Sequence, residues 1–170
     1  MEVKSFIRYL QQRWILCHAF QPPIVGCTDA EIEQLQAAQG VDYLPELYRE
    51  FMRQLGHEDG GLGKFLEADL SCSHVLTFKS AQNGYCLPLL RVFGVDKEAF
   101  VFYSDNTNFL YFFDTRDRSD DPVVFSIHEN SGIGDPHVKV KWGSLSSILV
   151  DFVEGCFDHV NWKETDASLD

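Results

Sequence analysis

Apolar residues recur at helical spacing near the start of the chain. Between positions 3 and 20 they stand three or four residues apart, with polar residues between them, at Val3, Phe6, Ile7, Leu10, Trp14 and Cys17. This period predicts an amphipathic helix that buries one face. Pro22-Pro23 should end it, because proline lacks the backbone N–H and restricts the residue before it.

Two further helices are predicted from their end signals. Thr28-Asp29-Ala30-Glu31 has the form of a capping box, in which the Thr28 hydroxyl accepts the Glu31 N–H and the Glu31 carboxylate accepts the Thr28 N–H. This helix is expected to end at Gly40, since glycine adopts the left-handed conformation easily. A third helix is predicted to begin at Pro45, where the missing donor does no harm, and to end at Gly56.

The pattern changes after residue 85 to short apolar and aromatic runs separated by polar turns. The runs predicted as strands are Leu87–Val95, Phe100–Tyr103, Phe109–Phe113, Val123–Ile127 and Val138–Trp142. Residues 104–108 and 114–121 are dense in turn formers, so the runs on either side of each should be strands joined by a turn. A last amphipathic helix is predicted to start near Ser144 and to include Cys156.

Helices first, then strands, then a closing helix predict an α+β fold with a mainly antiparallel sheet. The length of 170 residues suits one domain, which we expect to span residues 1–170. Within it, residues 1–25 form an N-terminal helical extension and residues 161–170 a polar tail. Residues 57–63 are predicted to form a glycine-rich loop. The pattern of residues 64–83 does not distinguish a short helix from turns.

The net charge of −12 narrows the classes of partner. Nucleic acid and anionic membranes are disfavoured, because contact with phosphate requires Lys and Arg. A basic protein partner suits this charge through steering and complementarity, although solubility alone also accounts for it. The five cysteines are odd in number and scattered, and no apolar run approaches a membrane span or a signal peptide. We therefore expect a cytoplasmic protein.

No catalytic, cofactor or metal site is predicted. The six histidines are dispersed, and Cys72-x-His74 is the only close Cys/His pair in the sequence. A structural zinc site usually shows paired ligands at short spacing, which this chain lacks. Gly60-Gly61-x-Gly63 has no Gly-Lys-Ser/Thr and follows two acidic residues, so it favours a flexible loop over a phosphate cradle. An enzyme with a Cys/His or carboxylate site stays an alternative.

Four segments, in this order, resemble the SUKH superfamily, whose members include a yeast-type regulator of cell-wall assembly and many bacterial immunity proteins. They are Thr28-x-x-Glu31-Ile32-x-x-Leu35; Leu44-Pro45-x-Leu47-Tyr48-x-x-Phe51 followed by Gly56; the hairpin Phe100–Asp114 followed by Pro122-Val123; and Trp142-x-x-Leu145-x-x-Ile148-Leu149-x-x-Phe152. The resemblance spans about residues 26–157. The helix at residues 3–20 lies ahead of it, and the hairpin turn lacks the glycine often found there.

The resemblance implies a module that binds a protein partner without catalysis, such as an immunity protein that neutralises a basic toxin. A regulatory scaffold of the same family is the alternative. Predicted partner-binding residues are the acidic and aromatic side chains around the strands: Glu58, Asp59, Tyr103, Asp105, Phe109, Tyr111, Asp114, Asp117, Asp120 and Asp121. Charges at a rim speed association, whereas aromatic anchors hold the partner. A simple solvated turn is the alternative for residues 114–121.

Overall fold

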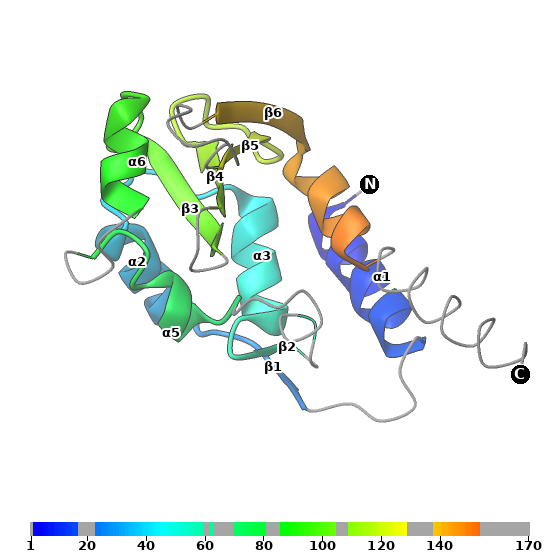
Figure 1. Cartoon of the computed structure of the whole chain (residues 1–170). Helices are drawn as coiled ribbons and strands as arrows, with labels where there is room; N and C mark the ends of the chain where they lie inside the picture. Colours follow the sequence, from blue (N-terminus) through cyan, green and yellow to red (C-terminus); the bar gives the residue numbers. More distant parts are fainter. Residues whose placement is uncertain are drawn as a thin grey trace, which may run out of the picture.

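A computed structural model describes residues 2–16, 23–59, 62, 70–80, 86–104, 109–128 and 138–153 (Figure 1). Its elements are α1 (Val3–Leu16), β1 (Ile24–Val25), α2 (Asp29–Ala38), α3 (Glu46–Leu55), β2 (Glu58–Asp59), α5 (Cys72–Val75), α6 (Cys86–Val92), β3 (Ala99–Ser104), β4 (Phe109–Asp114), β5 (Val123–His128) and β6 (Val138–Ser144). A closing helix covers residues 145–153. Several predictions fall outside these ranges, namely the helical character of residues 17–20, residues 60, 61 and 63 of the loop, residues 64–69 and 81–83, Asp105, Cys156 and the polar tail. Within the stretch that the sequence left open, residues 70–80 contain the short helix α5 and turns.

The α+β prediction is confirmed. The main sheet has the order β3-β4-β5-β6, and each neighbouring pair is antiparallel. A second, two-stranded sheet pairs β1 with β2, and the sequence pattern did not reveal it. Figure 1 shows α2, α5 and α6 on one side of β3, with α3 on the other. No helix in the described ranges is long and apolar enough to cross a membrane.

The predicted helix ends are confirmed at α2. The Thr28 hydroxyl accepts the Glu31 N–H at 3.4 Å, and a Glu31 carboxylate oxygen accepts the Thr28 N–H at 2.8 Å, which completes the capping box. Gly40 follows α2 with a φ of 66°, the left-handed conformation expected of a helix terminator. The local sequence therefore sets both ends of this helix.

The strand predicted at Leu87–Val95 is wrong, because most of it forms α6. A short apolar run has no decisive period, and here Cys86, Leu89 and Leu90 share the buried face of a helix. Pro88 lies in the first turn, where a missing N–H costs nothing. The overlooked signal is Gly94, whose φ of 65° ends the helix in the left-handed conformation.

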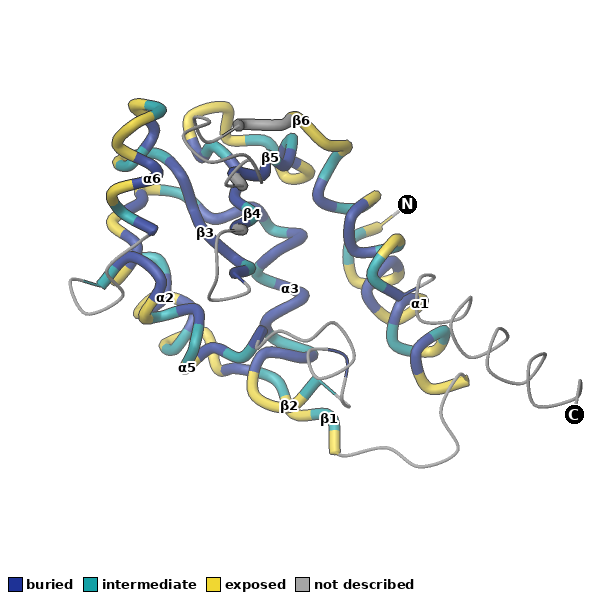
Figure 2. Tube along the Cα trace, in the orientation of Figure 1, coloured by how far each residue is buried: buried dark blue, intermediate teal, exposed yellow. Residues whose placement is uncertain are grey.

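The core lies between α3 and the main sheet. Tyr48 is almost fully buried, and its ring centroid lies 4.9 Å from that of Phe100 and 5.7 Å from that of Phe113. The opposite face of β4 is buried too, since Leu110 and Phe112 are completely inaccessible. Figure 2 shows the dark blue of buried residues along α3 and the strands β3 and β4. A sheet buried on both faces explains the near-continuous apolar runs of its strands.

The outer edge of β3 is closed by a side chain from the end of α2. Gln39, which is 2% exposed, accepts the Val101 N–H at 3.0 Å and donates to the Val101 carbonyl at 2.6 Å. The same amide donates to the Val75 carbonyl, and Lys79 Nζ donates to the Gln39 carbonyl. The amide thus occupies the place of a neighbouring strand, which protects an edge from pairing with another chain.

Candidate partner-binding surface

The turn between β4 and β5 attaches the closing helix to the sheet. One Asp121 carboxylate oxygen accepts the Ser146 N–H at 2.8 Å, and the other accepts the Ser146 hydroxyl at 2.6 Å. Leu145 N–H donates to the Pro122 carbonyl at 2.8 Å. The first N–H groups of a helix have no partner within the helix and carry partial positive charge, so an aspartate there stabilises the helix start. Asp121 is therefore a helix cap supplied from another element.

The neighbouring Asp120 faces the start of α3. Its carboxylate accepts the Tyr43 hydroxyl at 2.7 Å and lies 3.5 Å from the Glu46 N–H. Pro45, at the start of α3, provides no side-chain cap of its own. Burial and the Asp120 carboxylate raise the pKa of Tyr43 to about 12. Asp120 thus contacts the start of α3 and Asp121 caps the closing helix, and both residues stay exposed at the protein surface.

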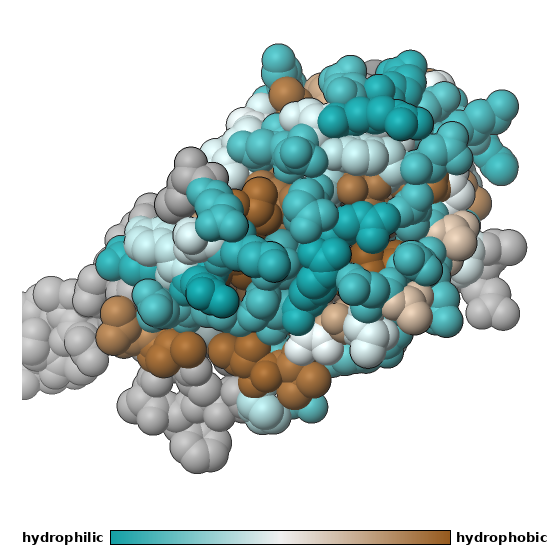
Figure 3. All heavy atoms as spheres, turned by 180° about the vertical axis from the view of Figure 1, so that it is seen from behind, coloured by the Kyte–Doolittle hydropathy of each residue, from teal (hydrophilic) through white to brown (hydrophobic). Residues whose placement is uncertain are grey.

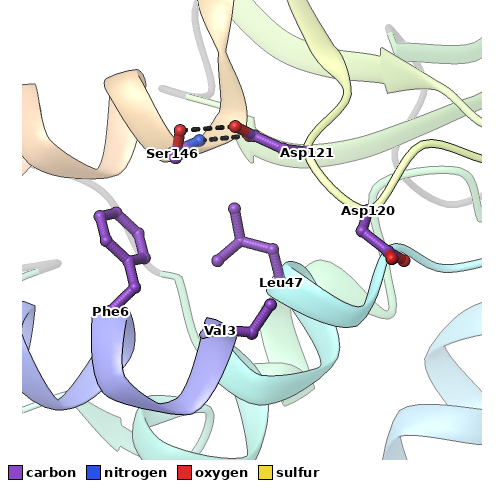
Figure 4. Close-up of a pocket in the computed structure, with 6 residues that line it drawn as sticks. All are labelled: Val3, Phe6, Leu47, Asp120, Asp121 and Ser146. Atoms are coloured by element: carbon purple, nitrogen blue, oxygen red, sulfur yellow. Dashed lines mark hydrogen bonds between the residues drawn. The ribbon is translucent and has the colours of Figure 1, made fainter. Parts of the chain in front are cut away.

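A pocket of about 360 Å³ lies between these two aspartates and α1 (Figure 4). Its apolar lining comes from α1 and α3, and its polar rim from the turn and the closing helix. The lining residues are Val3, Phe6, Leu47, Asp120, Asp121 and Ser146. Figure 4 shows Phe6 and Leu47 beneath the Asp121–Ser146 hydrogen bonds. The pocket has room for one apolar side chain with a basic group at its edge.

A second hollow of about 280 Å³ adjoins Asp120 on its other side. It is lined by Gln36, Asp42, Tyr43, Leu44, Glu46, Arg49 and Asp120. The Glu46 carboxylate is already paired with Arg53 at 2.8 Å, so the acidity comes from Asp42 and Asp120, which outnumber Arg49. The Arg49 guanidinium donates to Gln36 at 2.5 Å. We call the linings of both hollows together the Asp120 surface. It combines an apolar floor with a predominantly acidic rim, the composition that complements a basic partner.

The remaining acidic predictions divide between two places. Asp114 forms an ion pair with Arg116 two residues later, so much of its charge is neutralised locally. Asp117 is exposed in the same turn. Glu58 and Asp59 form β2, which follows the far end of α3. A helix of ten residues is about 15 Å long, so the structure separates these two residues from the Asp120 surface.

The aromatic predictions lie on the face of the sheet that α3 covers. Tyr103 and Tyr111 are cross-strand partners with ring centroids 5.2 Å apart. Both rings approach Phe152 of the closing helix, and Tyr111 also lies 6.0 Å from Trp142. They are half-buried in this cluster, whose most exposed member is Trp142 at 44%. The Phe109 backbone belongs to β4, but its side chain and Asp105 lie outside the described residues.

Exposed apolar residues lie mainly away from the Asp120 surface. Figure 3 shows a largely hydrophilic face, with apolar residues along its lower edge. Ile15 and Leu16 at the end of α1 are 48% and 77% exposed, and Val25 of β1 is 43% exposed. By contrast, Phe6 and Leu47 in the larger pocket are below 10% exposed. The Asp120 surface is consequently a narrow hollow with a charged rim, not an open apolar patch.

Sequence reasoning missed a second polar cluster, at the opposite end of α3. Atoms of Cys27, Glu31 and His57 that are able to bind a metal lie within 4.8 Å of one another. His57 Nε2 is 2.9 Å from a Glu31 carboxylate oxygen, and the thiols of Cys27 and Cys72 hydrogen-bond to each other. Cys27 and Glu31 are only four residues apart at the start of α2, but His57 follows α3 and Cys72 begins α5, so their approach to the first two is a tertiary contact that the sequence did not indicate.

The thiols in this cluster do not have the properties of a nucleophile. Burial raises the pKa of Cys27 to about 12, and burial likewise raises the pKa of Cys72. A reactive cysteine needs a lowered pKa, because the thiolate is the reacting species. The arrangement therefore gives little support to the Cys/His enzyme that the sequence left open.

A family model described as SMI1 / KNR4 family (SUKH-1) matches residues 26–151. The match includes α2, α3, the main sheet and most of the closing helix, whereas α1 lies ahead of it. No curated protein and no solved structure matches the chain. The Asp120 surface is therefore assembled from the matched segment plus one helix that the family model does not include.

Proposed function

Because the chain belongs to the SMI1/KNR4 family (SUKH-1), we propose that it is a non-enzymatic immunity-type module that binds and neutralises a basic toxin domain. The observation that carries this proposal is the Asp120 surface, an apolar hollow bordered by carboxylates on a protein with a net charge of −12. Such a surface attracts a basic partner over long range and then buries one of its apolar side chains.

Neutralisation is proposed to work by occlusion. Asp42, Asp120 and Asp121 present carboxylates that engage Lys and Arg on the toxin, as a phosphate backbone would. Phe6 and Leu47 supply the apolar contact. Because hydrophobic contact and packed anchors contribute most of the affinity, the charges should mainly accelerate association. A cytoplasmic location is part of the proposal and is supported by Cys27 and Cys72, whose neighbouring thiols form no disulfide bond.

The test is to look for a toxin-like gene beside this chain's gene and to measure complex formation with its product. The purified chain should bind that protein one to one, inhibit its activity, and bind more slowly as salt is raised. A complete absence of complex at low salt would refute the proposal. A complex that leaves the toxin active would refute neutralisation and favour the regulatory scaffold.

A further inference from the structure

We propose that Cys27, Glu31 and His57 form a binding site for a zinc-like divalent ion. This site is independent of the partner-binding proposal and lies at the other end of α3. Its three ligand atoms, a sulfur, a carboxylate oxygen and an imidazole nitrogen, already lie within 4.8 Å of one another. Sulfur and imidazole together favour Zn²⁺ over Mg²⁺ or Ca²⁺, which prefer oxygen ligands.

The distances require only small adjustments to bind the ion. With zinc–ligand bonds of about 2.0–2.3 Å, tetrahedral geometry places neighbouring ligand atoms roughly 3.4–3.6 Å apart. His57 Nε2 and the Glu31 oxygen are now 2.9 Å apart, so they need to separate by about 0.5 Å. The other Glu31 oxygen stays hydrogen-bonded to the Thr28 N–H and hydroxyl, at 2.8 and 2.7 Å. The capping box thus fixes the orientation of the carboxylate, as hydrogen bonds to metal ligands commonly do.

Backbone hydrogen bonds hold the ligand-bearing segments together. Cys27 N–H donates to the Met52 carbonyl at 2.8 Å, and His57 N–H donates to the Val25 carbonyl at 2.8 Å. Cys72 N–H donates to the Gly56 carbonyl at 2.7 Å, which places the Cys72 thiol beside that of Cys27. Gly56 itself leaves room for the ligand, because a Cβ at this position would overlap the Cys27 sulfur.

Charge and access also suit a divalent cation. Binding replaces the Cys27 thiol proton, which leaves to solvent, and a neutral His57 keeps its single proton on Nδ1. The Cys27 thiolate and the Glu31 carboxylate then balance the two positive charges of the ion. The Cys27 residue is 6% exposed, whereas the His57 side chain is 41% exposed, so the ion can enter from the imidazole side. The fourth position is open to water or to Cys72.

The experiment uses the full chain, reduced and freed of metal, titrated with Co²⁺ and then with Zn²⁺. One equivalent of Co²⁺ should produce thiolate-to-metal charge-transfer absorption, and Zn²⁺ should displace it. His57→Gln should weaken Zn²⁺ binding at least about tenfold, because even the loss of a residue that only hydrogen-bonds to a metal ligand costs about 10–100-fold. Cys27→Ala should abolish the charge-transfer band. Cys86→Ala is the matched control, since it removes another buried thiol away from the cluster.

Two results would overturn the site. One is Co²⁺ binding without any charge-transfer band in the reduced chain. The other is an unchanged Zn²⁺ affinity in His57→Gln, or in Cys27→Ala if that variant folds, which would mean adventitious binding elsewhere. Because His57 is at the surface, His57→Gln should fold normally, which near-native circular dichroism would verify, and its result is decisive even if Cys27→Ala does not fold.

Discussion

The two ends of α3 carry polar clusters that are built in opposite ways. At the N-terminal end, Asp120 and Asp121 are adjacent in the sequence, yet each carboxylate turns to a different helix. At the C-terminal end, His57 is 26 residues from Glu31 in the sequence, yet its imidazole converges with Cys27 and Glu31 from the start of α2. The dense run of acidic residues at the N-terminal end therefore serves helix capping as well as a binding rim. The convergence of different metal-binding groups at the C-terminal end is visible only in the folded structure. The following substitutions test the two ends separately.

The largest expected effect is at the C-terminal end. A Cβ at Gly26 would overlap the backbone carbonyl of Arg53, which cannot move without distorting α3. Gly26→Ala should therefore lower the free energy of unfolding by about 3 kcal/mol, measured by urea denaturation. Gly40→Ala is the control, since its position has a φ of 66° but open space around it, and should cost about 1 kcal/mol. An equal loss of unfolding free energy in both variants would contradict the close packing of Gly26 against the Arg53 carbonyl.

A smaller effect is expected from the cap of the closing helix. Asp121→Ala removes the acceptors of the Ser146 N–H and hydroxyl, so it should lower the free energy of unfolding by about 1–2 kcal/mol. The midpoint of urea unfolding should fall while its slope stays constant. Asp117→Ala, in the same turn, should stay within about 0.5 kcal/mol of wild type. If both variants behaved alike, Asp121 would be an ordinary solvated acid.

The smallest effect concerns the start of α3. Asp120→Asn keeps the shape but removes the negative charge beside the Tyr43 hydroxyl, so the pKa of Tyr43 should fall from about 12 toward 10. It should stay above 10, because burial is the larger cause of the shift. The ionisation of tyrosine is followed by ultraviolet absorbance in wild type, Asp120→Asn and Tyr43→Phe. The signal that is lost in Tyr43→Phe belongs to Tyr43. An unchanged Tyr43 pKa in Asp120→Asn would mean that the carboxylate does not contact the ring hydroxyl in solution.

Much of the fold could be predicted because its signals are local. The Thr28–Glu31 capping box, Gly40 and the helical period of α1 and α3 each depend on residues within one or two turns. The error at residues 87–95 arose because a buried apolar run suits a helix and a strand equally. The pairing of β1 with β2 and the closure of β3 by Gln39 depend on tertiary contacts, which no local pattern encodes.

The candidate sites were less predictable than the fold. The acidic residues 114–121 stood out in the sequence. Which of them forms an ion pair, which caps a helix and which stays at an exposed rim depends on the neighbouring elements in the fold. The pocket requires α1, which lies ahead of the matched family segment. The Cys27 cluster was not predicted because His57 and Cys72 reach Cys27 and Glu31 only through tertiary contacts, and the sequence drew attention to Cys72 only as part of Cys72-x-His74.

The central claim is that partner binding uses the N-terminal end of α3, and two double charge reversals test it. Asp42→Lys/Asp117→Lys reverses one carboxylate of the Asp120 surface and one exposed in the adjoining turn, without touching either helix cap, whereas Glu33→Lys/Glu58→Lys makes the same charge change at exposed sites elsewhere. Surface plasmon resonance against the neighbouring toxin-like protein at low salt should show association slowed about tenfold or more by the first pair and much less by the second. If both pairs slowed association equally, the effect would come from net charge alone. A larger loss of association rate from the second pair would contradict binding at the N-terminal end of α3.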